Sequence, residues 1–357
     1  MRALVIGGAT LDIIISYEEM ESMTHRKEKS EQTYLLLREG AKIEILSQKY
    51  CSGGGATNAS VSFKRQGLDV RLFCKVARDF PGDIILNELK SHGIEINAIK
   101  FSEQEGTATS FVVPSLSGDR TVFAYRGANT TLLSKELPLE AMKGVDFVYI
   151  TSLSRASAEH LPELVQAAKK LKIPVAVNPG ISQLKLGSGF LKEALSGIEI
   201  LITNYEEAQQ FSNSLMQLDR GLKAAGSGSL MQASFSLRAY VEQIFALGPK
   251  IVIVTNGREG VYVARPQEIL FHPVKSVPAQ NTLGAGDAFG SSFVGTYYTG
   301  ESIEDSIRAG IINSASVIAH ADAKSGLLMK GDLLKQIQDL KKENRLTRES
   351  LNASGRF

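Results

Sequence analysis

The chain has 357 residues, 43% of them hydrophobic, and its 40 basic and 38 acidic residues give a formal net charge of +2. This length suits one large α/β domain, or a core with a smaller appendage. The near balance of charge gives no indication of a nucleic-acid or membrane partner. Two cysteines, Cys51 and Cys74, are too few for a disulfide framework. Since no apolar run approaches the ~20 residues of a membrane span, we expect a cytoplasmic protein.

The first apolar run, Leu4–Ile6, predicts a strand and is too short in its apolar part for a signal peptide. Gly7-Gly8 follows this strand, with Asp12 close behind. In open α/β sheets, ligands bind outside the carboxyl ends of the strands. Asp12 is therefore a candidate binding residue, and a simple turn cap is the alternative.

Two stretches interrupt the strand–helix alternation, and we expect them to form a small β-sheet lid. Residues 13–50 contain a charged insertion, and residues 94–126 contain a predicted hairpin made of Thr109–Val113 and Thr121–Tyr125. The expected domains are an α/β core of residues 1–12, 51–93 and 127–345, a lid of residues 13–50 and 94–126, and a C-terminal tail of residues 346–357.

Further short apolar runs predict buried parallel strands with helices between them. The expected strands are Phe147–Ile150, Val175–Val177, Ile200–Ile202 and Ile251–Val254, and the expected helices include Ala158–Leu171 and Leu237–Leu247. This alternation predicts an α/β fold with a doubly wound, mostly parallel sheet flanked by helices. Residues 214–235, rich in Gly, Ser and Ala, predict a surface excursion, and Lys330–Phe357 predicts a final helix with a frayed tail.

The segment Gly284-Ala285-Gly286-Asp287 is the strongest candidate for a catalytic site. Its small residues leave backbone N–H groups uncovered where an apolar, helix-compatible run begins, and such a helix N-terminus binds anionic oxygens. Asp287 is placed to take a proton from a hydroxyl while these N–H groups hold the charge that develops on a phosphoryl group. The alternative is an ordinary helix start with an Asp near its cap.

A second glycine-rich segment, Gly53-Gly54-Gly55, leads into a predicted helix that contains Asn58. Glycines let the backbone approach a ligand closely, and the Asn58 amide offers a donor and an acceptor to hydroxyls. The segment is not a P-loop, because no Gly-Lys-Ser/Thr follows, and it does not have the spacing of a dinucleotide fingerprint.

With Asp12, Gly53–Asn58 and Asn281–Asp287 in this order, the chain resembles the ribokinase-like (PfkB) family of carbohydrate and nucleoside kinases over about residues 1–330. The two glycine-rich segments match the N-terminal and C-terminal signatures of that family. Asn204–Glu207 fits its Asn-x-x-Glu motif, and Thr255–Gly260 fits its nucleotide loop.

The resemblance implies an ATP-dependent kinase acting on a hydroxyl, most simply a primary one, of a small sugar or sugar derivative. Asp287 would be the base, and the N–H groups of Gly284, Ala285 and Gly286 would stabilise the transferred phosphoryl group. The residues that would bind the acceptor hydroxyls are Asp12, Gly54, Gly55 and Asn58.

The resemblance also implies ATP and Mg²⁺ as cofactors. Asn204, Thr255, Gly257 and Asn313 would bind the nucleotide, and Glu207 would hold Mg²⁺ through water, because Mg²⁺ releases its waters reluctantly. The signature usually opens with Asp, which helps to hold a monovalent cation in the members that K⁺ activates. Here Asn281 stands in that position, so K⁺ activation is doubtful. Thr10 and the lack of an acidic residue near Ser152 make ribose a weak candidate for the acceptor.

Two other functions stay open. A nucleoside kinase of the same family would be favoured by an aromatic residue that reaches the substrate from the lid, and the candidates are Tyr34, Phe101 and Tyr125. A non-catalytic sugar- or nucleotide-binding regulator is disfavoured by the intact Asp287. By analogy with the family, an exposed lid edge also allows a homodimer.

Overall fold

The computed structural model describes residues 1–18, 22–27, 30–115, 120–186, 188–219 and 235–351. Within these ranges, a nine-stranded sheet has the order β17-β16-β15-β14-β13-β12-β11-β1-β6. The strands from β14 to β6 pair in parallel, and β15, β16 and β17 add antiparallel strands at one edge. The strands are β1 (Arg2–Ile6), β6 (Asp69–Phe73), β11 (Phe147–Ile150), β12 (Val175–Val177), β13 (Ile200–Asn204), β14 (Ile251–Asn256), β15 (Gly260–Arg265), β16 (Glu268–Pro273) and β17 (Thr347–Ser350).

Helices cover both faces of this sheet because successive buried side chains of its strands point to opposite sides. Val5 belongs to the apolar core that contains Phe63 and Phe293, and Leu4 belongs to the core that contains Leu164 and Tyr240. The first face carries α1 (Gly55–Arg65), α2 (Phe80–Ser91), α8 (Ala285–Tyr298), α9 (Ile303–Ile318) and α10 (Lys330–Lys342). The second carries α3 (Leu161–Lys170), α4 (Ile181–Leu184), α5 (Ser188–Leu195), α6 (Tyr205–Asp219) and α7 (Leu237–Leu247). The expected doubly wound α/β fold is confirmed.

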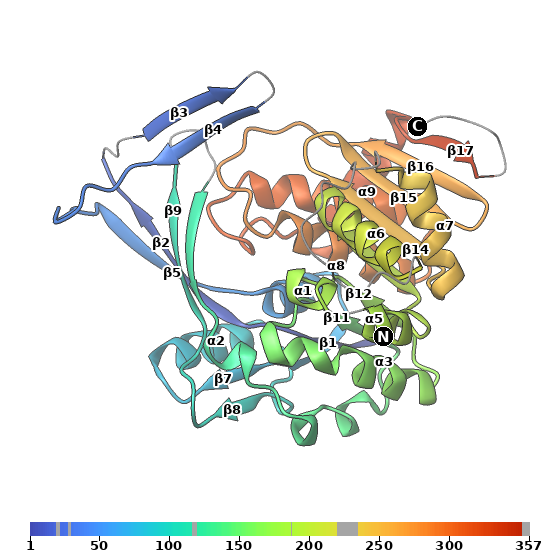
Figure 1. Ribbon diagram of the computed structural model, residues 1–357, viewed down its shortest axis with the longest axis horizontal. Helices are drawn as coiled ribbons and strands as arrows, with labels where there is room; N and C mark the ends of the chain where they lie inside the picture. The colour runs from blue at the N-terminus through green and yellow to red at the C-terminus, as the bar shows by residue number, and fades with distance from the viewer. Residues whose placement is uncertain (19–21, 28–29, 116–119, 187, 220–234, 352–357) are drawn as a thin grey trace.

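A second, four-stranded sheet stands beside the core, at the left of Figure 1. This lid sheet has the order β10-β9-β2-β5, made of Arg120–Tyr125, Thr109–Pro114, Thr10–Ser16 and Ser47–Gly53. Above it in Figure 1 lies a hairpin of β3 (Ser22–Lys27) and β4 (Ser30–Leu35). Asp12 is opposite Ser110 on one side and Cys51 on the other, so these three side chains share one face of the lid sheet.

The predicted hairpin at 109–125 forms, but the first part of the stretch 94–126 lies elsewhere. Residues 100–102 form β8 (Lys100–Ser102), which pairs in parallel with β7 (Lys75–Ala77) outside the lid sheet. The predicted helix Ala158–Leu171 begins as α3 only at Leu161, after a 3₁₀ segment at Arg155–His160. Pro162 explains this start, because proline is tolerated only in the first turn of a helix.

The expectation of a frayed tail is wrong for residues 347–350, which form β17 and pair with β16. Arg238 on α7 holds this strand, because its Nη2 donates to Glu349 Oε1 at 2.6 Å and its Nη1 to the Leu351 carbonyl at 2.7 Å. The predicted surface excursion at 214–235 falls mainly on residues 220–234, outside the described residues. Among the helices in the described ranges, none has the length and apolar composition needed to cross a membrane.

Candidate active site

The turn before α8 has a backbone that only glycine suits. Gly284 is the N-cap, with a left-handed φ of 78°, and a Cβ there would overlap Ala323. Two residues on, Gly286 is exposed, and a Cβ there would meet nothing within 4 Å. The 14-residue α8 thus begins beside open space at Gly286, where a helix N-terminus can bind an anion, although the Ala285 N–H also makes a long hydrogen bond of 3.4 Å to the Thr282 carbonyl.

Asp287 lies in the first turn of α8 and contacts the other glycine-rich segment. Asn58 Nδ2 donates to Asp287 Oδ2 at 2.8 Å, which joins two motifs 229 residues apart in the sequence. Burial raises the pKa of Asp287, and the hydrogen bond from Asn58 and the charge of Lys324 oppose that rise. A carboxylate with a raised pKa accepts a proton more readily, as a general base must.

Asp12 is the second carboxylate of the site and is only 8% exposed. Ser110 donates a hydrogen bond to Asp12 Oδ1 across the lid sheet. Burial raises the pKa of Asp12, and the negative charge of Asp287 adds to this effect. The two carboxylates are therefore electrostatic neighbours, although one belongs to the lid sheet and the other to the core.

The Gly53–Gly55 turn packs against both carboxylates. A Cβ on Gly53 would overlap the Asp12 carboxylate, and a Cβ on Gly55 would lie 3.2 Å from Asp287 Oδ1. Gly54 has a φ of 94° and packs against the Gly8 carbonyl so closely that a Cβ would clash with its carbon at 2.9 Å. The turn thus has no room for larger residues, and the structure brings Asp12, Gly54, Gly55, Asn58 and Asp287 together.

A cavity of about 710 Å³ adjoins the N-terminus of α8. Ala285 and Gly286 line it from one side, and Thr255 and Gly257 line it from the end of β14. Its further walls come from residues 273–279 and from α9. The cavity is large enough for a nucleotide, within the range typical of small-molecule sites, and it ends at the proposed phosphoryl-binding turn.

Asn204 and Glu207 form a capping box at the start of α6. Asn204 Oδ1 accepts from the Glu207 N–H at 2.8 Å, and Glu207 Oε2 accepts from the Asn204 N–H at 2.9 Å. Asn204 is the cross-strand neighbour of Thr255, which places the box next to the cavity. Burial raises the pKa of Glu207.

A single carboxylate next to this cavity fits Mg²⁺, which typically takes one or two carboxylates, several waters and substrate phosphates. Glu207 uses Oε2 in the capping box, and its other oxygen is compatible with a bound water of the ion. In the described part of the chain, His, Cys, Asp and Glu residues do not gather in a group of three that could hold a metal ion without such help.

The structure places the side chain of Asn313, a predicted nucleotide-binding residue, away from the lining of the cavity. Asn313 is fully buried in α9, where its Nδ2 donates to Ser292 Oγ at 2.6 Å and its Oδ1 accepts from the Leu328 N–H at 2.9 Å. Its neighbours Ser314 and Ala315 line the cavity instead. Successive side chains on a helix point about 100° apart, so the sequence alone does not show whether Asn313 or Ser314 faces the cavity.

The structure adds two cations that the sequence did not single out. Arg120, at the start of β10, donates to the Thr282 hydroxyl just before the turn at Gly284, and its charge also acts on Asp12. Lys324 is buried behind Ser52. No sequence signal marks a buried lysine, because lysines are almost always exposed.

Asn281, the unusual residue of the signature, makes hydrogen bonds through both the nitrogen and the oxygen of its side-chain amide. Its Nδ2 donates to the Ala321 carbonyl at 2.8 Å, and its Oδ1 accepts from the Leu283 N–H at 2.9 Å. The amide thus ties the segment before Gly284 to the loop that follows α9.

Comparison with known proteins agrees with this arrangement. Residues 18–328 match the sequence model of the pfkB family of carbohydrate kinases. An ATP-dependent ribose-1-phosphate kinase of Halopiger xanaduensis is 26% identical, over 74% of this chain and 79% of its own. A nucleoside kinase of Methanothermobacter thermautotrophicus is 22% identical, over 80% of this chain and 84% of its own. Among solved structures, the ribokinase of Arabidopsis thaliana complexed with ribose and ATP has a TM-score of 0.72 at 19% identity, covering 94% of this chain and 98% of its own.

Proposed function

This chain belongs to the pfkB family of carbohydrate kinases, and from that premise we propose that it transfers the γ-phosphoryl group of ATP in line to a primary hydroxyl of a small sugar or sugar derivative. The Asn58–Asp287 hydrogen bond carries this proposal. It joins the segment suited to acceptor hydroxyls to the carboxylate at the phosphoryl-binding turn.

In the proposed mechanism, the acceptor hydroxyl gives its proton to Asp287 while its oxygen bonds to the γ-phosphorus and the bond to the β-phosphate oxygen breaks. The N–H groups of Gly284, Ala285 and Gly286 stabilise the charge on the transferred group. Asp12, Asn58 and the backbone of Gly54 and Gly55 orient the acceptor, a contribution that phosphoryl transfer depends on strongly.

We propose that ATP fills the cavity lined by Thr255 and Gly257, with Asn204 near its phosphates. Glu207 would hold Mg²⁺ through water, and the ion would supply charge neutralisation at the phosphates. Chelation with EDTA should stop turnover, and added Mg²⁺ should restore it.

The acceptor class is tested by an ADP-release screen over ribose, ribose 1-phosphate, inosine and a panel of other sugars. We expect a sugar or sugar derivative to give the highest kcat/KM. The structure gives little support to stacking of a nucleoside base by two of the candidate aromatics. The Arg78 guanidinium lies 4.2 Å from the Phe101 ring centre, and the Tyr125 hydroxyl donates to Glu105 Oε2. A best substrate among nucleosides would select the nucleoside-kinase alternative, and the absence of ADP release with every acceptor would select the regulator.

The decisive variant is Asp287→Asn, which keeps the shape of the side chain and removes the base. We expect kcat to fall by about 10²–10⁴-fold, the usual contribution of general-base catalysis, with ATP binding and folding retained. Near-native turnover of this variant with the best acceptor would show that Asp287 is not the base.

We also propose that turnover does not need K⁺, because Asn281 is uncharged and both ends of its amide are hydrogen-bonded, to Ala321 and to Leu283.

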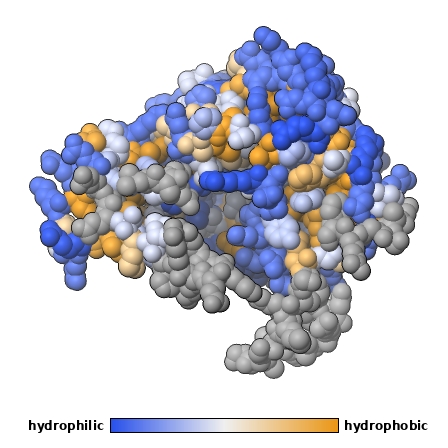
Figure 2. Space-filling model, turned by 90° about the horizontal axis from the view of Figure 1, so that it is seen from above, coloured by the Kyte–Doolittle hydropathy of each residue, from blue (hydrophilic) through white to orange (hydrophobic). Residues whose placement is uncertain are grey.

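A homodimer through the lid sheet is supported by aromatic side chains on the face opposite Asp12. Phe111, Phe123 and Tyr50 lie in one cross-strand row there and are 49%, 54% and 41% exposed. Apolar residues reach the surface at this end, at the left of Figure 2. The dimer is tested by comparing the sedimentation of Phe123→Asp with that of the native chain. A cytoplasmic location without a nucleic-acid or membrane partner stays a prediction.

A further inference from the structure

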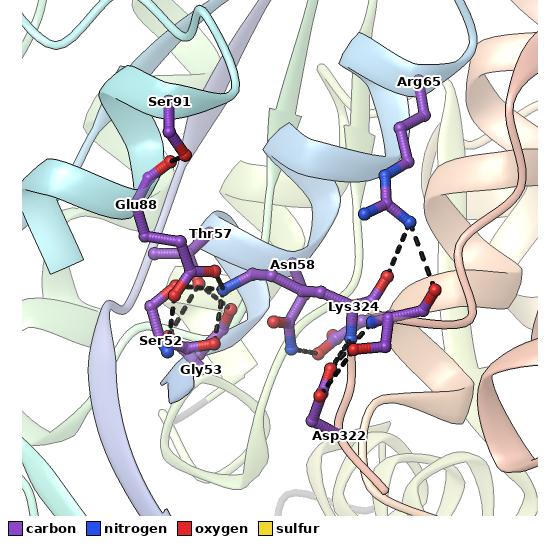
Figure 3. A network of polar contacts seen from close by, with 12 residues as sticks. Ser52, Gly53, Thr57, Asn58, Arg65, Glu88, Ser91, Asp322 and Lys324 are labelled. Atoms are coloured by element: carbon purple, nitrogen blue, oxygen red, sulfur yellow. Dashed lines mark hydrogen bonds and ion pairs between the residues drawn. The ribbon is translucent and has the colours of Figure 1, made fainter. Parts of the chain in front are cut away.

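A buried lysine lies directly behind the turn that is proposed to bind the acceptor. The Lys324 side chain is 6% exposed, and its Nζ lies 3.3 Å from Glu88 Oε1. The same Nζ donates to the carbonyl and the hydroxyl of Ser52, the residue just before Gly53 (Figure 3). Glu88 completes a triangle, because its Oε2 accepts from the Ser52 N–H at 3.0 Å.

The backbone around Lys324 is fixed from two other elements. Arg65 on α1 donates from Nη1 to the Lys324 carbonyl at 2.8 Å and to the Leu327 carbonyl at 2.5 Å. Asp322 accepts from the Lys324 N–H at 3.0 Å and pairs with Lys49 of the lid sheet at 2.6 Å. The ammonium group therefore has little freedom to move away from Ser52.

The Lys324 ammonium is buried and its partner Glu88 is 29% exposed, and such a pair is weak evidence for stability, because desolvation of the buried charge offsets the attraction. Lys324 and Glu88 therefore call for a reason other than folding. The charge of Lys324 lowers the pKa of both Asp12 and Asp287, against the rise that burial causes. It acts on the two carboxylates that face the acceptor, while its hydrogen bonds hold the turn between them.

We propose that Lys324 is a positioning residue of the phosphoryl-transfer reaction: it holds Ser52, and with it Gly53–Gly55, in the shape that receives the acceptor, and it provides the positive charge that keeps Asp12 and Asp287 ionised. This inference rests on the proposed function of Asp287. Because Asp12 and Asp287 act as carboxylates, activity is present above their pKa values and is lost as the pH falls through them. The charged and titratable groups that surround this site are Glu88 on α2, His92 just after α2, Lys49 and Cys51 on β5, Arg65 on α1, Arg120 on β10, and Asp322.

The test is Lys324→Met, measured as the pH dependence of kcat/KM for the acceptor, using whichever of ribose, ribose 1-phosphate or inosine gives ADP release. Without the cation, the carboxylate pKa values rise, so the acidic limb of the profile should move to higher pH. A rise of one unit makes kcat/KM about tenfold lower on the acidic side. The KM for the acceptor should rise several-fold, and the KM for ATP should stay native.

A matched control and a second variant keep this test decisive. Lys49→Met removes a lysine from the same network, but its side chain is 54% exposed and its charge is not among the largest influences on Asp12 or Asp287. Its acidic limb should stay native. Lys324→Met leaves the 29% exposed Glu88 without its partner, so the double variant Lys324→Met/Glu88→Gln should be easier to fold and should show the same shift.

The possible outcomes separate this inference from the proposed function. One outcome is that Asp287→Asn is inactive while the double variant keeps both the native acidic limb and the native acceptor KM. The positioning role of Lys324 is then overturned, and Asp287 is still supported as the base. If Asp287→Asn keeps turnover, the base is wrong, and the acceptor KM of the Lys324 variants still decides whether Lys324 positions the turn beside Asp12.

Discussion

The two glycine-rich turns of the site use the same small residues for different physical reasons. At 53–55, neighbouring atoms fill the space around the backbone, and side chains on Gly53 and Gly54 would overlap Asp12 and the Gly8 backbone. At 284–286, Gly284 is required by its φ of 78° and by the closeness of Ala323, but Gly286 opens onto empty space. The first turn is tightly packed beside the proposed acceptor site, and the second has open space at Gly286 beside the proposed phosphoryl site. Substitutions at matched positions test this difference.

Among the substitutions that compare the two turns, the largest effect is expected for Gly53→Ala. Its Cβ would overlap the Asp12 carboxylate, which is held on its other side by Ser110, so the carboxylate must move. We expect kcat/KM for the acceptor to fall at least tenfold through KM, with a destabilisation of about 1–3 kcal/mol from overpacking. Steady-state kinetics and urea unfolding measure the two effects. A native acceptor KM would mean that the turn does not shape the acceptor site.

An intermediate effect is expected for Asn281→Asp, which alters the connection behind the second turn. The substitution removes the 2.8 Å hydrogen bond to the Ala321 carbonyl and sets a carboxylate against that oxygen. The variant should lose turnover several-fold in tetramethylammonium chloride and regain it in KCl, because a cation can separate the two oxygens. The native chain should turn over equally in both salts. Strong K⁺ activation of the native chain would contradict the inference drawn from Asn281.

The smallest effect is expected for Gly286→Ala, the counterpart of Gly53→Ala in the open turn. A Cβ at Gly286 meets no atom within 4 Å, and alanine is favoured over glycine in a helix. We expect the free energy of unfolding to rise by up to ~1 kcal/mol and the acceptor KM to stay native. Thermal unfolding and steady-state kinetics together check this outcome. A destabilised Gly286→Ala would show that the second turn is packed as tightly as the first.

Local features of the sequence predicted the strands and the two motifs well. Val175–Val177 is a continuous apolar run and forms β12 with those bounds, and Leu237–Leu247 has the bounds of α7. The candidate catalytic segment at 284–287 could be recognised because glycine and aspartate leave a local signature at a helix start. The contact between Asn58 and Asp287 could be expected only from the family, since it joins distant segments.

The features that escaped prediction depend on neighbours from several elements. Lys324 is buried because Ser52, Glu88 and Arg65 converge on its loop from a lid strand and two helices. Asn313 is one residue from the cavity-lining Ser314, a difference of helix orientation that no single sequence specifies. The pairing of β8 with β7 likewise joins short strands with no periodic pattern long enough to read.

The short strand β17 has a consequence for how this protein behaves at high concentration. Without it, β16 would be the edge of the central sheet and would offer unpaired backbone groups beside Ile269, Leu270 and Phe271. Such an apolar edge is a template for pairing with other chains. The sequence Thr-Arg-Glu-Ser replaces it with a charged four-residue edge, fastened by Arg238. We therefore expect β17, which covers the apolar edge of β16, to limit pairing between chains at high concentration.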